Sequence, residues 1–229
     1  MDVDPITNLQ PTGLLELKQS DTSRLEFLPT IWDASTALIS PVLENRFSGL
    51  KRLEEYDAIR HHVLVAHLLV TRINEPDIEL RSRVINALAS VFTSDGEEYT
   101  STEKVRRHLT NCLAGLRTRQ IFAMLQVADF DPSSEPAVAG LMSYCSFAGG
   151  HLADILGNRR TPLSIRKHAA HFIGRIGFLD ALPCLERLEA RLESRLSGRN
   201  SFAESDCDQG EEHSLLPLLK DALSLLRAP

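Results

Sequence analysis

Residues 162–188 read PLSIRKHAAHFIGRIGFLDALPCLERL, and the spacing of apolar residues in this stretch decides the fold. Ile165 is followed by Arg166, and more apolar residues lie four, seven, eight and eleven positions after Ile165. These residues are Ala169, Phe172, Ile173 and Ile176. The spacing puts them on one side of a helix with 3.6 residues per turn, so it predicts an amphipathic α-helix. Pro162 suits the first turn of that helix.

The same pattern occurs three more times, each time with an arginine directly after the first apolar residue. The three pairs are Ile59-Arg60, Leu80-Arg81 and Val105-Arg106. The same offsets then fall on Val63, Ala66, His67 and Val70, on Val84, Ala87, Leu88 and Val91, and on Leu109, Cys112, Leu113 and Leu116. We interpret the recurrence as an internal repeat. The alternative is that any helical protein gives similar stripes.

The repeat leads to three expectations about packing. The four arginines are expected to face the joints between repeats. Six stripe residues are expected to be core: Val84, Ala87, Leu109, Cys112, Ala169 and Ile173. The residues expected to cap helix N-termini are Asp57, Asp77 and Thr102, because their side chains accept hydrogen bonds from unpaired backbone N–H groups.

Residues 162–188 resemble a HEAT repeat. The matching residues of its second helix are Ile165-Arg166, Ala169, Ala170, Ile173-Gly174 and Ile176-Gly177, and those of the next unit's first helix are Asp180-Ala181-Leu182-Pro183, Leu185 and Leu188. Residues 75–91 and 57–70 are similar more loosely.

The resemblance covers roughly Leu38 to Leu196 and implies the fold class. It implies an all-α protein, a HEAT-like α-α superhelix (solenoid) of about four to five degenerate helix pairs with a closing C-terminal helix. In this family the arginine helps to tie neighbouring repeats together, and the stack has a concave face. HEAT arrays serve as scaffolds, adaptors, lyase subunits and DNA-binding proteins, so the resemblance is a weak guide to function.

The chain divides into four segments. We expect an N-terminal segment and capping helix over 1–37 with Trp32 in the cap, HEAT-like repeats over 38–197, an acidic flexible linker over 198–213, and a C-terminal helix over 214–229 that packs on the stack. Six further helices are expected at 41–55, 118–128, 136–148 (capped by Ser134), 150–156, 180–196 and 214–227, with Gly149-Gly150 as a helix break. The total is nine to eleven helices and no strand.

Composition narrows the class of protein. Hydrophobic residues make up 43% and charged residues 24% of the 229, which is typical of a globular chain. The four cysteines form no CxxC pair, so a tetrathiolate zinc site is not expected. Met1 is followed by no signal peptide pattern, and the apolar run Val63 to Val70 is too short to cross a bilayer. We therefore expect a cytoplasmic protein without a membrane partner.

Charge is spread unevenly along the chain. The balance is −7 over residues 1–100, +5 over 101–200 and −4 over 201–229. The residues taken from the basic middle as a candidate partner-binding surface are Arg106, Arg107, Arg159, Arg160, Arg166, Lys167 and Arg175. The alternative is that these arginines are structural and paired with neighbouring carboxylates. The linker acids could occupy this basic surface, although a plain solvated loop is the favoured interpretation.

The sequence offers no strong catalytic or metal motif. His168 and His171 lie three apart, and His61, His62 and His67 lie close together, but no supporting ligand spacing accompanies them, so neither a metal nor another cofactor is expected. The spacing of His108 and Cys112 suits a nucleophile–base pair, but a buried stripe cysteine would be inert.

Three functions remain. The first choice is a non-catalytic protein–protein interaction or scaffold module, whose partner is another protein that the sequence does not identify. The alternative is a nucleic-acid-binding protein resembling HEAT-like DNA glycosylases, which would use the basic middle segment and has Asp154 and Asp180 as candidate carboxylates. The third, a chromophore-lyase-like role, has no residue that singles it out.

Overall fold

The computed structural model describes residues 28–93, 100–196 and 214–228. In this part of the chain the protein consists of twelve α-helices and three short 3-10 helices, with no strand. The prediction of an all-α protein is therefore confirmed. None of the described helices combines the length and the apolar character needed to cross a membrane.

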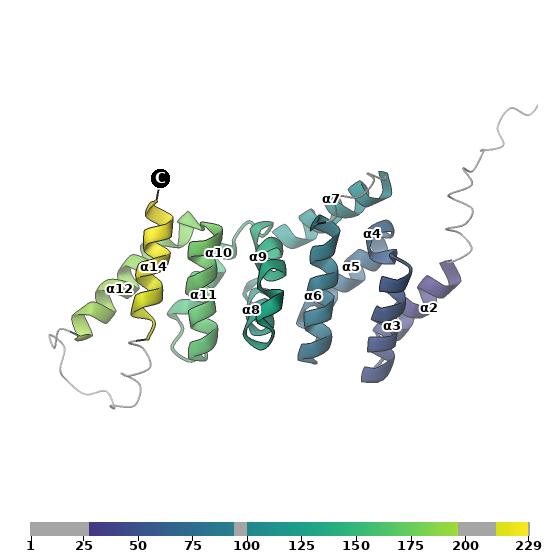
Figure 1. The fold of residues 1–229 in the computed structure, drawn as a ribbon, viewed down its shortest axis with the longest axis horizontal. Coiled ribbons are helices and arrows are strands. Elements are labelled where there is room, and N and C mark those ends of the chain that lie inside the picture. The colour runs from purple at the N-terminus through teal and green to yellow at the C-terminus, as the bar shows by residue number, and fades with distance from the viewer. Residues whose placement is uncertain (1–27, 94–99, 197–213, 229) are drawn as a thin grey trace, which may run out of the picture.

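The longer helices stand side by side in two rows (Figure 1). One row contains α3 (Leu43–Glu55), α6 (Ile78–Thr93), α9 (Glu135–Ser143), α11 (Leu163–Ile176) and α14 (Leu216–Arg227). The other contains α2 (Leu28–Leu38), α5 (Val63–Thr71), α8 (Thr118–Phe130), α10 (Ala148–Gly157) and α12 (Leu182–Leu196). Consecutive helices alternate between the rows, while α4 (Ala58–His61) and α7 (Thr100–Ala114) lie beside α5. The 3-10 helices are η1 (Arg72–Asn74), η2 (Pro132–Ser134) and η3 (Leu179–Ala181).

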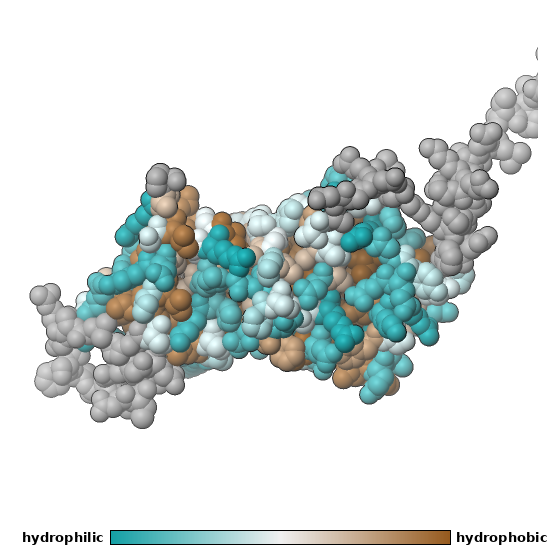
Figure 2. Space-filling model, viewed as in Figure 1, coloured by the Kyte–Doolittle hydropathy of each residue, from teal (hydrophilic) through white to brown (hydrophobic). Residues whose placement is uncertain are grey.

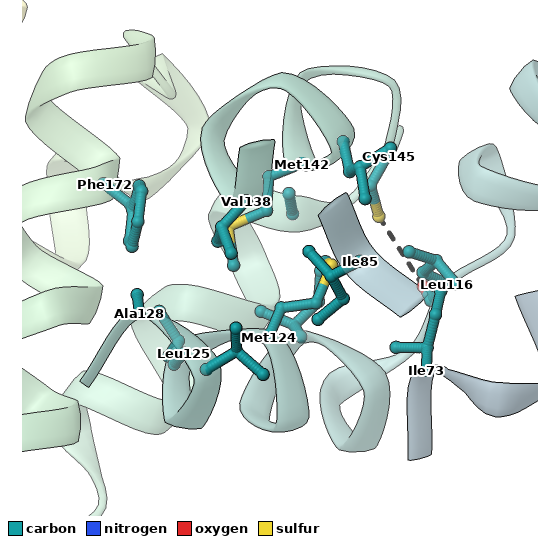
Figure 3. Packing of buried hydrophobic residues seen from close by; sticks show 14 of the residues in the cluster. Ile73, Ile85, Leu116, Met124, Leu125, Ala128, Val138, Met142, Cys145 and Phe172 are labelled. Carbon is teal, nitrogen blue, oxygen red and sulfur yellow. Dashed lines mark hydrogen bonds between the residues drawn. The ribbon is translucent and has the colours of Figure 1, made fainter. Parts of the chain in front are cut away.

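The core lies between the two rows, and the apolar stripes supply it. Figure 3 shows Ile85 of α6, Met124 of α8, and Val138 and Met142 of α9 converging in this layer. Five of the six predicted core residues are buried, namely Val84, Ala87, Leu109, Ala169 and Ile173. The prediction for Cys112 is wrong, because its side chain is only partly buried.

The four stripe arginines lie at joints between elements. Each donates to a backbone carbonyl: Arg60 to Ser90, Arg81 to Glu75, Arg106 to Val91 and Arg166 to Leu156. Ser90, Val91 and Leu156 lie in the last turns of α6 and α10. Carbonyls in a last turn have no partner within their own helix, so a guanidinium from a neighbouring helix satisfies them.

The C-terminal helix packs on the stack, as predicted. Leu219, Ala222 and Leu223 of α14 are buried, and α14 contacts both α11 and α12. A Cβ atom added at Gly174 of α11 would lie 2.7 Å from Ala222 Cα, so the absence of a side chain at Gly174 allows the two helices to approach closely. At the other end of the stack, α2 contacts α3 in the same way through Gly49.

Several local expectations are wrong. The helix expected across residues 57–70 is interrupted, because His62 has an extended backbone (φ −121°, ψ 109°) between α4 and α5. Trp32 does not cover the first repeat. It is 71% exposed, because Ile31, Ala34 and Leu38 form the buried face of α2.

The three expected N-caps have different outcomes. The side chain of Asp77 accepts a hydrogen bond from Leu80 N at 2.8 Å and caps α6 as predicted. Asp57 occupies the N-cap position of α4 in a left-handed conformation but makes no capping bond, and Thr102 lies within α7. Ser134 precedes α9 but also does not cap it, because its hydroxyl is buried against Asp131, Ser82 and Asn86.

Gly149 and Gly150 do not break a helix, since both lie in the first turn of α10. A Cβ at Gly149 would lie 1.9 Å from Asp180 Oδ1, and Gly150 N donates to Asp180 Oδ2 at 3.1 Å. The first N–H groups of a helix have no partner within the helix. The glycine at position 149 therefore makes room for a carboxylate from η3 that caps α10.

Candidate interaction groove and histidine–cysteine cluster

The predicted basic surface is divided in the structure. Arg166 is 3% exposed and Arg106 is partly buried, and both donate to backbone carbonyls inside the stack. Arg175 is exposed and pairs with Glu135. The remaining residues of the set are Arg107 on α7, Arg159 and Arg160 in the turn after α10, and Lys167 on α11. Helices α7 and α11 lie at separate positions along the molecule, so the described residues of this set do not converge (Figure 1).

His168 and His171 each contact a carboxylate rather than sharing a ligand. His168 Nε2 lies 3.4 Å from Asp129 Oδ1, and His171 Nε2 lies 2.7 Å from Glu135 Oε1. Partial burial acts to raise the pKa of Glu135, but the hydrogen bond and charge of His171, together with Arg175, outweigh it and lower the pKa. These contacts link α11 to α8 and α9 and are structural.

An apolar groove of about 350 Å³ lies between α6 and α9. Its apolar lining comes from both helices and consists of Ala89, Phe92, Pro136, Ala137, Leu141 and Tyr144. Amide and hydroxyl groups come from Asn86, Ser90, Thr93, Ser133 and Ser143. An apolar lining with a few polar groups is typical of a ligand-binding site.

Two features shape this α6–α9 groove. The rings of Phe92 and Tyr144 stack with their centroids 4.4 Å apart, which joins α6 to α9 at the ends of both helices. Gly140 lies in the lining, and a Cβ atom added there would meet nothing within 4 Å. The groove therefore owes part of its room to the absence of a side chain at Gly140. Figure 2 shows the row that faces the viewer, which contains α3, α6, α9, α11 and α14 and is called the near row. Its surface is mainly hydrophilic, with hydrophobic residues in separate small areas.

A second candidate site is formed by His67, His108 and Cys112. His67 Nδ1 lies 3.2 Å from His108 Nε2, and Cys112 Sγ lies 3.4 Å from His108 Nε2 and 3.7 Å from His67 Nδ1. The same three atoms form all three contacts, so they define one triangle. Among the described residues, these three side chains form the one group of histidine, cysteine or acidic residues whose ligand atoms lie close enough together to share a metal ion.

The local sequence explains why two of the three residues of this cluster lie together. His108 and Cys112 are four residues apart on α7, so they lie one turn apart on one face of the helix. The i, i+4 spacing was visible in the sequence. His67 comes from α5, which packs beside α7. The stripe position of His67 predicts a residue facing the core, but the helix is interrupted at His62, a new helix starts at Val63, and His67 is exposed.

Cys112 Sγ contacts His108 Nε2 as in a nucleophile–base pair, but the shift in the thiol pKa opposes activation of the cysteine. Burial raises the pKa of the Cys112 thiol, which disfavours the thiolate when no metal ion is bound. A reactive cysteine requires the thiolate, which a lowered pKa favours. Of the two candidate glycosylase carboxylates, Asp154 is exposed on α10 and Asp180 caps that helix.

Comparison of the chain with protein-family models, with curated proteins and with solved structures finds no match.

Proposed function

We propose that the protein is a HEAT-like α-solenoid that acts as a non-catalytic protein-interaction module and binds a short apolar segment of a partner protein in the α6–α9 groove. The observation that carries this proposal is the groove itself, an apolar hollow of about 350 Å³ between two neighbouring helices of one row. Stacked helix pairs offer their partners extended surfaces of this kind.

The chemistry of the groove favours a peptide over a polyanion. Its lining is apolar with uncharged hydroxyl and amide groups, which suits apolar side chains and the backbone of a bound segment. Nucleic acid would instead need several cations near its phosphates. The exposed cations Arg107, Arg159 and Arg160 lie on α7 and after α10, away from this groove.

The test fills the groove. The Gly140→Leu substitution places a side chain in open space on α9, and leucine is a better helix former than glycine, so the fold is expected to be retained. Peptides selected from a displayed library on the natural protein are measured by fluorescence anisotropy. We expect the selected peptides to contain apolar residues. We also expect them to bind the Gly140→Leu variant at least about tenfold more weakly than the natural protein, which corresponds to about 1.4 kcal/mol of binding free energy.

The matched control is Gly150→Leu on α10, where an added Cβ also meets nothing within 4 Å. This variant is expected to bind the selected peptides as the natural protein does. The proposal is contradicted if the peptides bind Gly140→Leu undiminished, if both variants weaken binding equally, or if no peptide is selected.

A further inference from the structure

The cluster of His67, His108 and Cys112 has no part in the proposed groove, since it lies on α5 and α7 rather than between α6 and α9. Two helices contribute to it: α5 supplies one imidazole, and one face of α7 supplies a second imidazole and a thiol. His67 is exposed, whereas His108 and Cys112 are half-buried. A small ion can therefore reach the three donor atoms from solvent.

The triangle has the dimensions of one face of a zinc tetrahedron. Zinc–nitrogen bonds of about 2.0–2.1 Å and a zinc–sulfur bond of about 2.3 Å place the nitrogens about 3.3 Å apart and each nitrogen about 3.6 Å from the sulfur. The observed N–N separation is 3.2 Å, and the two N–S separations are 3.4 Å and 3.7 Å. All three separations thus lie within about 0.2 Å of the zinc geometry.

Protons alone do not satisfy three such contacts. The inward nitrogen of each imidazole, in His67 and in His108, holds either a proton or one lone pair, so it either donates or accepts. A thiol has one proton to donate. At most two of the three edges are then well-directed hydrogen bonds. A cation at the centre uses one lone pair from each donor and leaves none of them unsatisfied.

We propose that His67 Nδ1, His108 Nε2 and Cys112 Sγ bind one zinc ion, with Cys112 as the thiolate and its proton released to solvent as the metal binds. Two imidazoles and a thiolate form a borderline-soft ligand set, which zinc prefers over the oxygen ligands of magnesium or calcium. Three protein ligands leave a fourth tetrahedral position, which water or a group from a binding partner would fill. Bound zinc would also fix α7 to α5, so metal binding would stabilise the folded chain.

The experiment uses the full chain after treatment with a chelator. Cobalt(II) replaces zinc as a visible probe, because a tetrahedral cobalt–thiolate site gives a charge-transfer band that sites without sulfur lack. Zinc affinity is measured by competition with a chromophoric chelator. We expect one cobalt ion per chain with that band, displacement of cobalt by zinc, and a higher Tm with zinc present.

Three single substitutions distinguish the proposed zinc ligands from residues that do not bind the metal. Cys112→Ser is expected to abolish the charge-transfer band. His67→Asn, at an exposed position where loss of folding is not expected, should weaken zinc binding by more than the about 10–100-fold that loss of an outer-shell partner costs. Cys184→Ser is the matched control, because this half-buried thiol on α12 contacts the Ala153 carbonyl instead.

Circular dichroism confirms that each variant is folded. The proposal is overturned if the chain binds less than one equivalent of cobalt, if the band survives Cys112→Ser, or if Cys184→Ser removes it. Unchanged zinc affinity in His67→Asn would likewise overturn it. Peptide binding in the α6–α9 groove is measured separately, so failure of one proposal is distinguishable from failure of the other.

Discussion

Glu75 carries a carboxylate into the interior of the stack. Its side chain is 1% exposed, Arg46 Nη2 of α3 lies 2.8 Å from Oε1, and Arg72 Nη1 of η1 lies 3.8 Å from Oε2. The Arg46 contact is an ion pair rather than a well-directed hydrogen bond. The Glu75 backbone carbonyl also accepts from Arg81 Nε. One residue thus connects three elements.

Neutralising Glu75 should destabilise the protein strongly. In Glu75→Gln the partly buried Arg46 guanidinium loses its buried counter-charge, and loss of one partner of a buried pair costs up to about 3–5 kcal/mol. The free energy of unfolding in urea measures this loss. The control is Glu79→Gln, because Glu79 pairs with Arg83 at 2.9 Å with both side chains more than half exposed. That change should cost less than about 1 kcal/mol. Equal costs would refute the role given to burial.

The Asp131 carboxyl connects α6 to η2 through hydrogen bonds that favour its charged form. Hydrogen bonds from Ser133 and Ser134 lower the pKa of its carboxyl, and Ser82 of α6 adds another. Since the pKa is lower in the folded state than in the unfolded chain, the unfolded chain binds more protons as the pH falls. The stabilising contribution is therefore complete above the ordinary carboxyl pKa of about 3.9, and is lost as the pH falls through the lower folded value.

Asp131→Asn should reveal this contribution. We expect the variant to have a lower Tm than the natural protein at pH 7. The difference should hold down to about pH 5 and shrink below about pH 4. In that range the Asp131 carboxyl of the natural protein becomes protonated, first in the unfolded chain and at lower pH in the folded one. Thermal unfolding at several pH values measures it. A difference in Tm that does not change with pH would show that the Asp131 charge has no part in stability.

At the scale of elements, the C-terminal helix is held by a close crossing. Gly174 of α11 faces Ala222 of α14, and an added Cβ would lie 2.7 Å from Ala222 Cα and 3.0 Å from Ala222 Cβ. Gly174→Ala should therefore push α14 away and cost about 1–3 kcal/mol, as overpacking of a core does. Hydrogen exchange in residues 216–227 should become faster.

The control for this crossing is Gly157→Ala at the end of α10, where an added Cβ meets nothing within 4 Å. Replacement of glycine by alanine in a helix normally stabilises it by up to about 1 kcal/mol. The two substitutions should therefore have opposite signs. If Gly174→Ala also stabilises the protein, the close approach does not limit the docking of α14.

Element boundaries show where local patterns stop being informative. Gly149 and Gly150 suggested a break because glycine is a poor helix former, yet α10 includes both. The compensation is the Asp180 carboxylate, which caps the helix from η3 and needs the space at Gly149. That partner lies about thirty residues further along the chain. No propensity of the two glycines themselves could reveal it.

At the scale of the whole molecule, each helix contacts mainly its neighbours in the facing row and in its own row. In the near row, α3 contacts α6, α6 contacts α9, α9 contacts α11 and α11 contacts α14 (Figure 1). A long arrangement of this kind distributes its surface widely, so charges close in sequence need not meet. The positive balance of residues 101–200 is accordingly divided between α7 and the α10–α11 region.

The sequence by itself determined the all-α class, the buried stripes, the arginines at the joints and the C-terminal helix that packs on α11. These properties follow from apolar residues that recur with a period of 3.6, because this spacing identifies the face of each helix that is buried away from water. The tertiary structure alone decided that His67 meets His108 and Cys112, that α6 and α9 leave a groove, and that Asp180 caps α10. Each of these depends on how far one helix is shifted and tilted against another, and the packing of side chains from distant segments fixes that geometry.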